Sequence, residues 1–226
     1  MNRRRSVAKA AAKPRIIATS WYAVLLAAIV VAAALLGSAQ IHAAPAANPA
    51  EAFVQQNVDR AFAVVNDASM SDEQRYMQFR ELILSLIDAR RIGMFTLGTY
   101  ANGASKDDID AFIVAFSDYT IRFIYGAGFA QTRGQTPKVT GSLQRAADDV
   151  GVNCEVAGPN AQNAQPLKIA FRVRRAADGR PIVTDLQVEG VWLALLQRSD
   201  FSAFLQQNGG HVAELTADLQ RLTRSR

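Results

Sequence analysis

Few side chains of this 226-residue sequence have the types and spacing that catalysis requires. Once the first 46 residues are set aside, one cysteine, Cys154, and one histidine, His211, remain, 57 positions apart. A lone thiol and a lone imidazole are poor candidates for a zinc site or for a nucleophile with its general base. Because Cys154 lies within the strand-like run 150–156, we expect it to be a small buried residue.

Acidic residues at three places could be proposed as functional, and each place has a structural explanation. Residues 107–110 contain three aspartates after Ser105, a pattern typical of the first turn of a helix, where carboxylates favour the positive end of the dipole. A metal cluster is the alternative for these three acids. Asp88 precedes two arginines and indicates a helix end with a local ion pair, whereas Asp148–Asp149 stands between strands and favours a turn.

Short catalytic motifs are absent from the sequence. Residues 103–107 approach the G-x-S-x-G motif but lack its second glycine, and neither a phosphate-binding glycine loop nor H-E-x-x-H is present. We therefore predict no catalytic residue and no metal site. A carboxyl group held in an apolar pocket is the alternative route to catalysis, and no acid of this sequence is indicated for that role.

The first 46 residues have the composition of an export signal. Six basic residues and no acid precede an apolar run over residues 21–36, and small residues follow. This order is typical of a secretory signal peptide, cleaved here after Ala39 or Ala46. We therefore expect an exported protein whose residues 47–226 form one domain. An uncleaved membrane anchor is the alternative, because the stretch 16–37 approaches the roughly 20 apolar residues that span a bilayer.

Export changes the charge balance of the chain. The full sequence has 25 Lys and Arg against 20 Asp and Glu, and the signal removes six of the basic residues. The remaining 19 basic residues against 20 acids leave a net charge of −1, so nucleic-acid binding is not supported. With one cysteine the exported domain has no internal disulfide, and apolar burial must stabilise it.

Periodicity predicts helices at the beginning and the end of the mature chain. Between residues 47 and 125, apolar residues recur at helical spacing after three start signals. These signals are Asn48 before a proline, the capping box of Ser71 with Gln74, and Ser105. Further helices are expected from Ser199 to the Gly209–Gly210 pair and over residues 212–222.

From residue 135 the period changes toward two, which predicts strands. We expect strands over 138–140, 150–156, 167–173, 182–188 and 191–196, with Asp178–Gly179 as the hairpin turn between the third and fourth. Helices, then antiparallel strands, then helices define the α+β class. We predict one mainly antiparallel sheet of about four strands wrapped by amino-terminal and carboxyl-terminal helices.

Apolar side chains are more abundant on the helices and strands than one packing seam requires. An ordinary closed core is one interpretation of this surplus. The other is that sheet and helices do not close fully and leave a slot for an apolar ligand.

Four segments of the sequence resemble motifs of the MlaC family of periplasmic lipid-binding proteins, also called toluene-tolerance auxiliary proteins. Residues 91–100 are similar to the family segment around "LG.YW", and residues 185–193 to its "D..veGvSl" strand pair. Residues 197–201 resemble its "yR.eF" turn, and residues 208–210 its "GG" before the last helix. The order and spacing of the four motifs, over about residues 49–222, carry the resemblance.

Three departures from the family pattern resemble a branch associated with hopanoid biosynthesis clusters, described as HpnM. Ala101 stands where the family has tryptophan, and residues 180–184 lack the usual tryptophan. Trp192 replaces the serine of the strand pair. These departures concern the identity of the lipid rather than the architecture.

The resemblance implies a periplasmic carrier that moves between the inner and outer membranes. It implies an apolar pocket between sheet and helices that shields an acyl or polycyclic lipid, a phospholipid or a hopanoid. The implied partners of the carrier are an inner-membrane ABC transporter with an MCE-domain subunit and an outer-membrane lipoprotein complex, and the resemblance implies no cofactor. A hopanoid-pathway accessory protein, a scaffold without ligand and a lipid-modifying enzyme on the same fold are the alternatives. Family analogy and the apolar faces together predict ten lipid contacts: Phe79, Ile83, Leu86, Phe116, Tyr119, Phe123, Phe171, Val173, Val188 and Leu193.

The resemblance also carries over recurrent positions, which we expect to be structural. We expect Asp185 and Arg198 to form a charged pair that fixes the sheet to the following helix. Contact of Arg198 with a lipid phosphate at the pocket mouth is the alternative. The recurrent positions are Leu97, Gly98, Tyr100, Asp185, Gly190 and Phe201.

Overall fold

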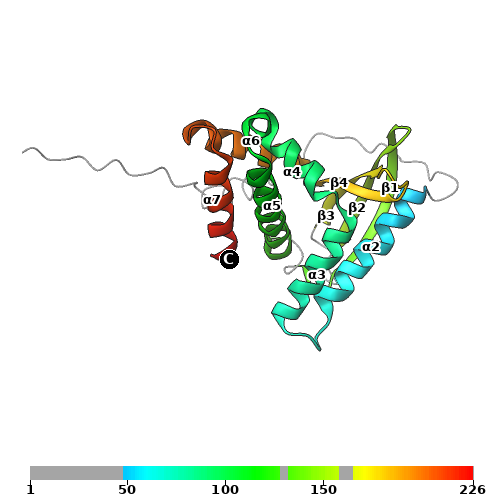
Figure 1. The fold of residues 1–226 in the computed structure, drawn as a ribbon. Helices are drawn as coiled ribbons and strands as arrows, with labels where there is room; N and C mark the ends of the chain where they lie inside the picture. Colours follow the sequence, from blue (N-terminus) through cyan, green and yellow to red (C-terminus); the bar gives the residue numbers. More distant parts are fainter. Residues whose placement is uncertain (1–47, 128–131, 158–164, 226) are drawn as a thin grey trace, which may run out of the picture. The chain divides into compact units, whose positions relative to one another are not determined.

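Helices occupy the first part of the described chain, strands follow, and two helices end it (Figure 1). The computed structural model describes residues 48–127, 132–157 and 165–225. The predicted α+β class is confirmed. The elements are α2 (Pro49–Asn66), α3 (Asp72–Leu86), α4 (Ala89–Leu97), η2 (Gly98–Gly103), α5 (Lys106–Ala127), β1 (Thr136–Ala146), β2 (Asp149–Ala157), β3 (Leu167–Arg175), β4 (Pro181–Val188), β5 (Val191–Trp192), α6 (Leu193–Gln207) and α7 (Val212–Arg224).

The strands form one antiparallel sheet in the order β1-β2-β3-β4-β5. The fifth strand has two residues, so the described sheet is slightly larger than the four strands expected. The predicted hairpin between β3 and β4 is confirmed, and Gly179 takes a positive φ of 82° in its turn. The turn from β4 to β5 has positive φ at both Glu189 and Gly190, which is typical of a two-residue hairpin loop.

The predicted starts of the first helices are also confirmed. Asn48 caps α2 by accepting a hydrogen bond from the amide of Ala50, with proline in the first turn. Ser71 and Gln74 form the reciprocal capping box of α3. The local ion pair expected of Asp88 is wrong, because its side chain caps α4 by accepting from the amide of Arg91, while Arg90 pairs with Asp110. The three caps satisfy amide groups that a helix leaves without intrahelical partners.

The strand predicted over residues 191–196 is wrong beyond Trp192, and the helix predicted from Ser199 begins earlier, at Leu193. The cause is a contact between distant parts of the sequence. The Asp185 carboxylate on β4 accepts hydrogen bonds from the amides of Leu186, at 2.8 Å, and Ala194, at 3.1 Å. Since Trp192 provides no side-chain cap, Asp185 satisfies a first-turn amide of α6 from the neighbouring strand.

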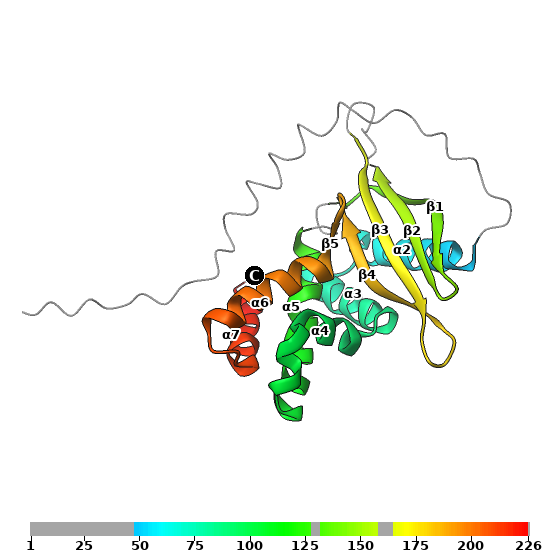
Figure 2. The ribbon, with the colours of Figure 1, turned by 90° about the horizontal axis from the view of Figure 1, so that it is seen from above.

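Buried apolar side chains of the described residues form three clusters. One lies between α2 and the strands β2 and β3, and Figures 1 and 2 show α2 running along one face of the sheet. The second joins α4, α5, α6 and α7, and the third joins α2, α3 and α5. Within the described ranges, no helix has the length and apolar content needed to cross a bilayer.

Replacing Asp185 tests its role as the cap of α6. We expect Asp185→Ala to lower the free energy of unfolding by about 1–2 kcal/mol, because two amides lose their acceptor. Asp185→Asn retains an acceptor oxygen and should lose less than half of that amount in urea unfolding at neutral pH. An equal loss in both variants would contradict the capping role.

The wild type and Asp185→Asn should also differ in how their free energy of unfolding depends on pH. Burial raises the pKa of Asp185 above its ordinary value, so the folded state holds this proton more tightly than the unfolded state. The free energy of unfolding of the wild type, measured relative to Asp185→Asn, should therefore fall as the pH rises from about 4 through the folded pKa.

Candidate functional site

An apolar cavity of about 90 Å³ lies between three helices, α2, α3 and α5, and the strands β3 and β4. The surface that it offers is entirely apolar. Asn57 is its one polar lining residue, and this amide is already satisfied, since it donates to the carbonyl of Phe53 and accepts from Arg60. The lining residues are Phe53, Val54, Asn57, Val58, Ala61, Ile83, Leu86, Ile87, Ile124, Phe171, Val183 and Leu186.

Regular spacing on each element places these side chains around the cavity. Helix α2 contributes residues at successive turns of one face, from Phe53 to Ala61. On the sheet, Phe171 of β3 and Leu186 of β4 are register partners, so their side chains lie on the same face. The cavity therefore forms where the apolar face of β3 and β4 meets the helices.

The last turn of α3 forms the wall at the edge of β4. Ile87 makes an isolated parallel bridge with Val183, and both residues line the cavity. Arg180 at the start of β4 donates a hydrogen bond of 3.2 Å to the carbonyl of Ser85. These two contacts connect the carboxyl end of α3 to the sheet.

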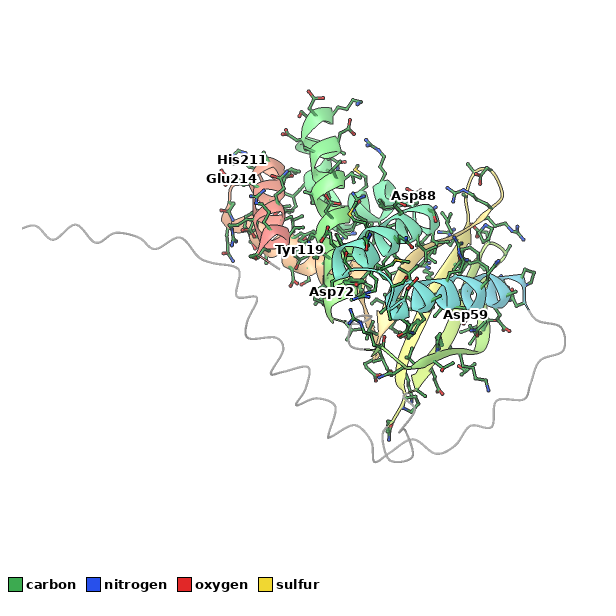
Figure 3. All side chains as sticks on the ribbon, turned by 90° about the horizontal axis from the view of Figure 1, so that it is seen from below. Asp59, Asp72, Asp88, Tyr119, His211 and Glu214 are labelled. Atoms are coloured by element: carbon green, nitrogen blue, oxygen red, sulfur yellow. The ribbon has the colours of Figure 1, made fainter. Side chains whose placement is uncertain are left out.

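No lining residue of the cavity is an acid, a histidine, a tyrosine or a cysteine. Figure 3 shows His211 and Glu214 on α7, well apart from Asp59 on α2. In the described part of the chain, no group of three or more histidine, cysteine or acidic side chains could hold a metal ion. The arrangement of the cavity supports binding of apolar groups rather than acid–base chemistry.

Comparisons with known proteins match this architecture. Residues 55–221 match the family described as MlaC protein. The chain belongs to the MlaC family. A solved structure of the phospholipid-binding protein from Ralstonia solanacearum, in complex with a phospholipid, has the same fold with a TM-score of 0.67. The two chains are 24% identical over 78% of this chain and 97% of that one.

The MlaC resemblance stated from the sequence is thus confirmed. Assignment to the hopanoid-associated branch stays a prediction.

The structure brings three of the ten predicted lipid contacts, Ile83, Leu86 and Phe171, to the cavity of this MlaC-family chain. The other seven lie elsewhere, and their contact with lipid stays a prediction. Four of them belong to the apolar clusters: Phe79 to that of α2, α3 and α5, Phe116 to that of α4–α7 with Tyr119 packed against it, and Val173 to that between α2 and the sheet. The other three are Phe123, half-buried on α5, Val188 on β4, and Leu193 at the start of α6.

Residues of α2 line the cavity and were not among the predicted contacts. Val54, Val58 and Ala61 lie on one helical face, and this spacing indicates only that the face is buried. Whether a buried face lines a cavity depends on how it packs against elements that are distant in sequence. The signal that could have identified α2 is therefore its spacing combined with the expected position of the sheet.

The expected ion pair between Asp185 and Arg198 is wrong. The carboxylate of Asp185 binds backbone amides, and Arg198 instead contacts the carboxyl end of α4. Its guanidinium donates to the carbonyl of Phe95 at 3.3 Å and lies 4.9 Å from the centre of that ring. A cation is favourable near a helix carboxyl terminus. The contact of Arg198 with a lipid phosphate stays a prediction.

Other recurrent positions of the MlaC family have structural contacts. Gly98 ends α4 with a φ of +58°, and a Cβ there would lie 3.1 Å from the guanidinium of Arg198. Leu97 and Phe201 are buried in the cluster of α4–α7, and Tyr100 packs against it. The Tyr100 ring also covers Gly210, which has positive φ.

Cys154 is buried in the sheet, as predicted, and burial raises the pKa of its thiol to about 11. At about pH 8 the thiolate fraction should be about a hundredfold below that of an ordinary cysteine. We expect a thiol-specific disulfide reagent to react with the native protein at least about a hundredfold more slowly than with the protein unfolded in urea. Comparable rates in the two states would contradict this environment.

Proposed function

We propose that this chain is a periplasmic lipid carrier that takes the acyl part of a lipid into the cavity between α2, α3, α5 and the sheet. The observation that carries the proposal is the cavity itself, since eleven of its twelve lining residues are apolar and none is titratable. Membership of the MlaC family supports it, and the similar Ralstonia solanacearum protein binds a phospholipid. Both comparisons favour a binding protein over an enzyme.

The hydrophobic effect explains why a lipid needs a carrier to cross an aqueous compartment. Each methylene group exposed to water costs about 0.8 kcal/mol, so a chain of about fifteen methylenes costs roughly 12 kcal/mol. This cost makes free passage of a lipid through an aqueous compartment slow. Burial in an apolar cavity removes most of the cost without any covalent step, while the polar head group stays near water.

Lipid loading must widen the cavity. Its volume of about 90 Å³ is well below the roughly 300–1,000 Å³ of typical ligand pockets. Helix α2 packs over a core shared with β2 and β3, whereas the carboxyl end of α3 is joined to the sheet by the Ile87–Val183 bridge and the Arg180–Ser85 hydrogen bond. The carboxyl end of α3 is therefore the wall that we expect to move.

Filling the cavity tests the carrier function. Protein purified from the cell envelope should carry a lipid-sized adduct in native mass spectrometry, and Ala61→Phe should reduce the loaded fraction at least about tenfold, because a ring occupies the space of the acyl chain. Ala63→Phe on the exposed side of the same helix is the matched control and should load normally. If Ala61→Phe fails to fold, Ile124→Phe fills the same cavity from α5.

Two results would overturn the carrier function. One is wild-type protein that carries no lipid and takes up none from liposomes, which would favour a scaffold without ligand. The other is equal loading of the cavity-filling variant and its control.

The site of action and the partners are also part of the proposal. We infer that the signal is cleaved and that the domain moves between an inner-membrane ABC transporter with an MCE-domain subunit and an outer-membrane lipoprotein complex. Amino-terminal sequencing of protein from the periplasmic fraction should begin at Gln40 or Ala47. Full-length protein recovered only with the inner membrane would contradict cleavage.

A further inference from the structure

A second, larger cavity lies on the opposite face of β3 and β4. Its volume is about 290 Å³, close to the lower end of ligand pockets. Since successive side chains of a strand point to opposite faces, Arg172 and Asp185 face this cavity while Phe171 and Leu186 face the apolar one. Helix α4 and the start of α6 form the opposite wall. We call this cavity the arginine groove.

Four guanidinium groups line the arginine groove. Two of them have carboxylate partners, since Arg172 binds Asp149 through Nε at 3.0 Å and Arg174 binds Asp148 at 2.9 Å. Arg91 on α4 and Arg145 on β1 have no carboxylate within ion-pair distance among the residues that the structure describes. Two guanidinium groups in the groove are therefore available to a ligand.

Hydrogen-bond donors exceed free acceptors in the groove. The Nε atom of Arg174 is buried and has no hydrogen-bond partner within the described ranges. Two backbone amides bind Oδ1 of Asp185, which leaves Oδ2 as the remaining carboxylate acceptor of the lining, and the Thr184 hydroxyl donates to the carbonyl of Arg172. Because the guanidinium donors of Arg91 and Arg145 outnumber this one acceptor, the site favours an anion, and phosphate oxygens match the guanidinium fork.

Large apolar side chains also line the groove beside the arginines, and two of them are partly exposed. Phe95 is 41% exposed and Leu195 is 54% exposed, and both line the groove beside Trp192. The guanidinium of Arg145 lies 6.0 Å from the centre of the Trp192 ring. Guanidinium groups next to large apolar side chains suit a ligand that carries an anionic group beside a hydrocarbon part.

We propose that the arginine groove binds the phosphate group of an amphiphile, with Arg91 and Arg145 as its principal contacts. A phospholipid head group and free phosphate share this chemistry, and the apolar side chains favour the lipid. The proposal goes beyond the carrier function, because the groove and the apolar cavity lie on opposite faces of the sheet and share no lining residue.

The Trp192 indole provides a probe inside the groove. Protein labelled with ¹⁵N, purified from cells that express the full chain, is titrated with sodium phosphate, dihexanoyl phosphatidic acid or dihexanoylglycerol, with sodium chloride matching the ionic strength. Both phosphate ligands should shift the indole signal with saturation, and phosphatidic acid should bind more tightly. Dihexanoylglycerol, which lacks the phosphate, should leave the signal unchanged. Equal affinities of phosphate and phosphatidic acid would assign the groove to the free anion and overturn the lipid source.

Charge-matched variants separate specific contact from general attraction. Arg91→Gln with Arg145→Gln should weaken both phosphate ligands by about tenfold or more, and because both residues are exposed the double variant should fold. Arg224→Gln, an exposed arginine of α7, is the control and should bind as the wild type does.

Three results would overturn the groove proposal. They are the absence of a saturable shift, equal weakening in the control, and tighter binding of an acidic hexapeptide than of phosphatidic acid. The last result would assign the groove to a protein partner. Native mass spectrometry of the double variant separates the groove proposal from the carrier proposal. The double variant should still carry lipid in its apolar cavity, whether or not the groove binds phosphate.

Discussion

Side-chain alternation along β3 and β4 separates an apolar face of the sheet from a charged one, and both cavities depend on this separation. Phe171 and Leu186 point toward α2 and α3, while the neighbouring residues Arg172 and Asp185 point toward α4 and α6. A shift of one residue in the pairing of these strands would exchange the two faces. The register is held at one end by the Asp178–Gly179 hairpin and at the other by Glu189, whose amide donates to the carbonyl of Lys168 and whose side chain accepts from the amide of Lys168.

Asp185 connects this sheet to the carboxyl-terminal helices. By accepting the amide of Ala194, its carboxylate places the start of α6 beside β4. Trp192 and Leu195, two of the apolar side chains that line the arginine groove, are positioned by the same contact. The half-buried carboxylate of Asp185 therefore has the structural role that the sequence predicts for this position, although its partners are backbone amides rather than Arg198.

The sequence predicted those features that depend on neighbouring residues. The capping box of α3, the start of α2 and the hairpin at Gly179 follow from residues within a few positions of one another, and the structure contains all three. The end of β5 was not predictable in this way, because residues 193–196 are apolar and fit a strand or a helix. The amide–carboxylate contact that decides for a helix spans nine positions.

The sequence predicted an apolar cavity between sheet and helices but did not identify most of the residues that line it. Periodicity identifies which face of α2 or α3 is buried, and it contains no information about how closely two buried faces meet. Ile83, Leu86 and Phe171 were found because their faces are strongly apolar. The helical spacing of Val54 and Ala61 does not identify them as cavity residues, since a residue beside a hollow and a residue in a filled core have the same spacing.

The small volume of the apolar cavity has a kinetic consequence. When the cavity is empty, its walls lie close together and expose little hydrocarbon to water. Binding a lipid therefore yields no favourable free energy until a wall has been displaced. In the carrier that we propose, the exchange of cargo would be governed by an activation barrier of the protein itself, the separation of Ile87 from Val183. A partner that lowers this barrier at one membrane would set where the lipid leaves, without any difference in affinity between the two membranes.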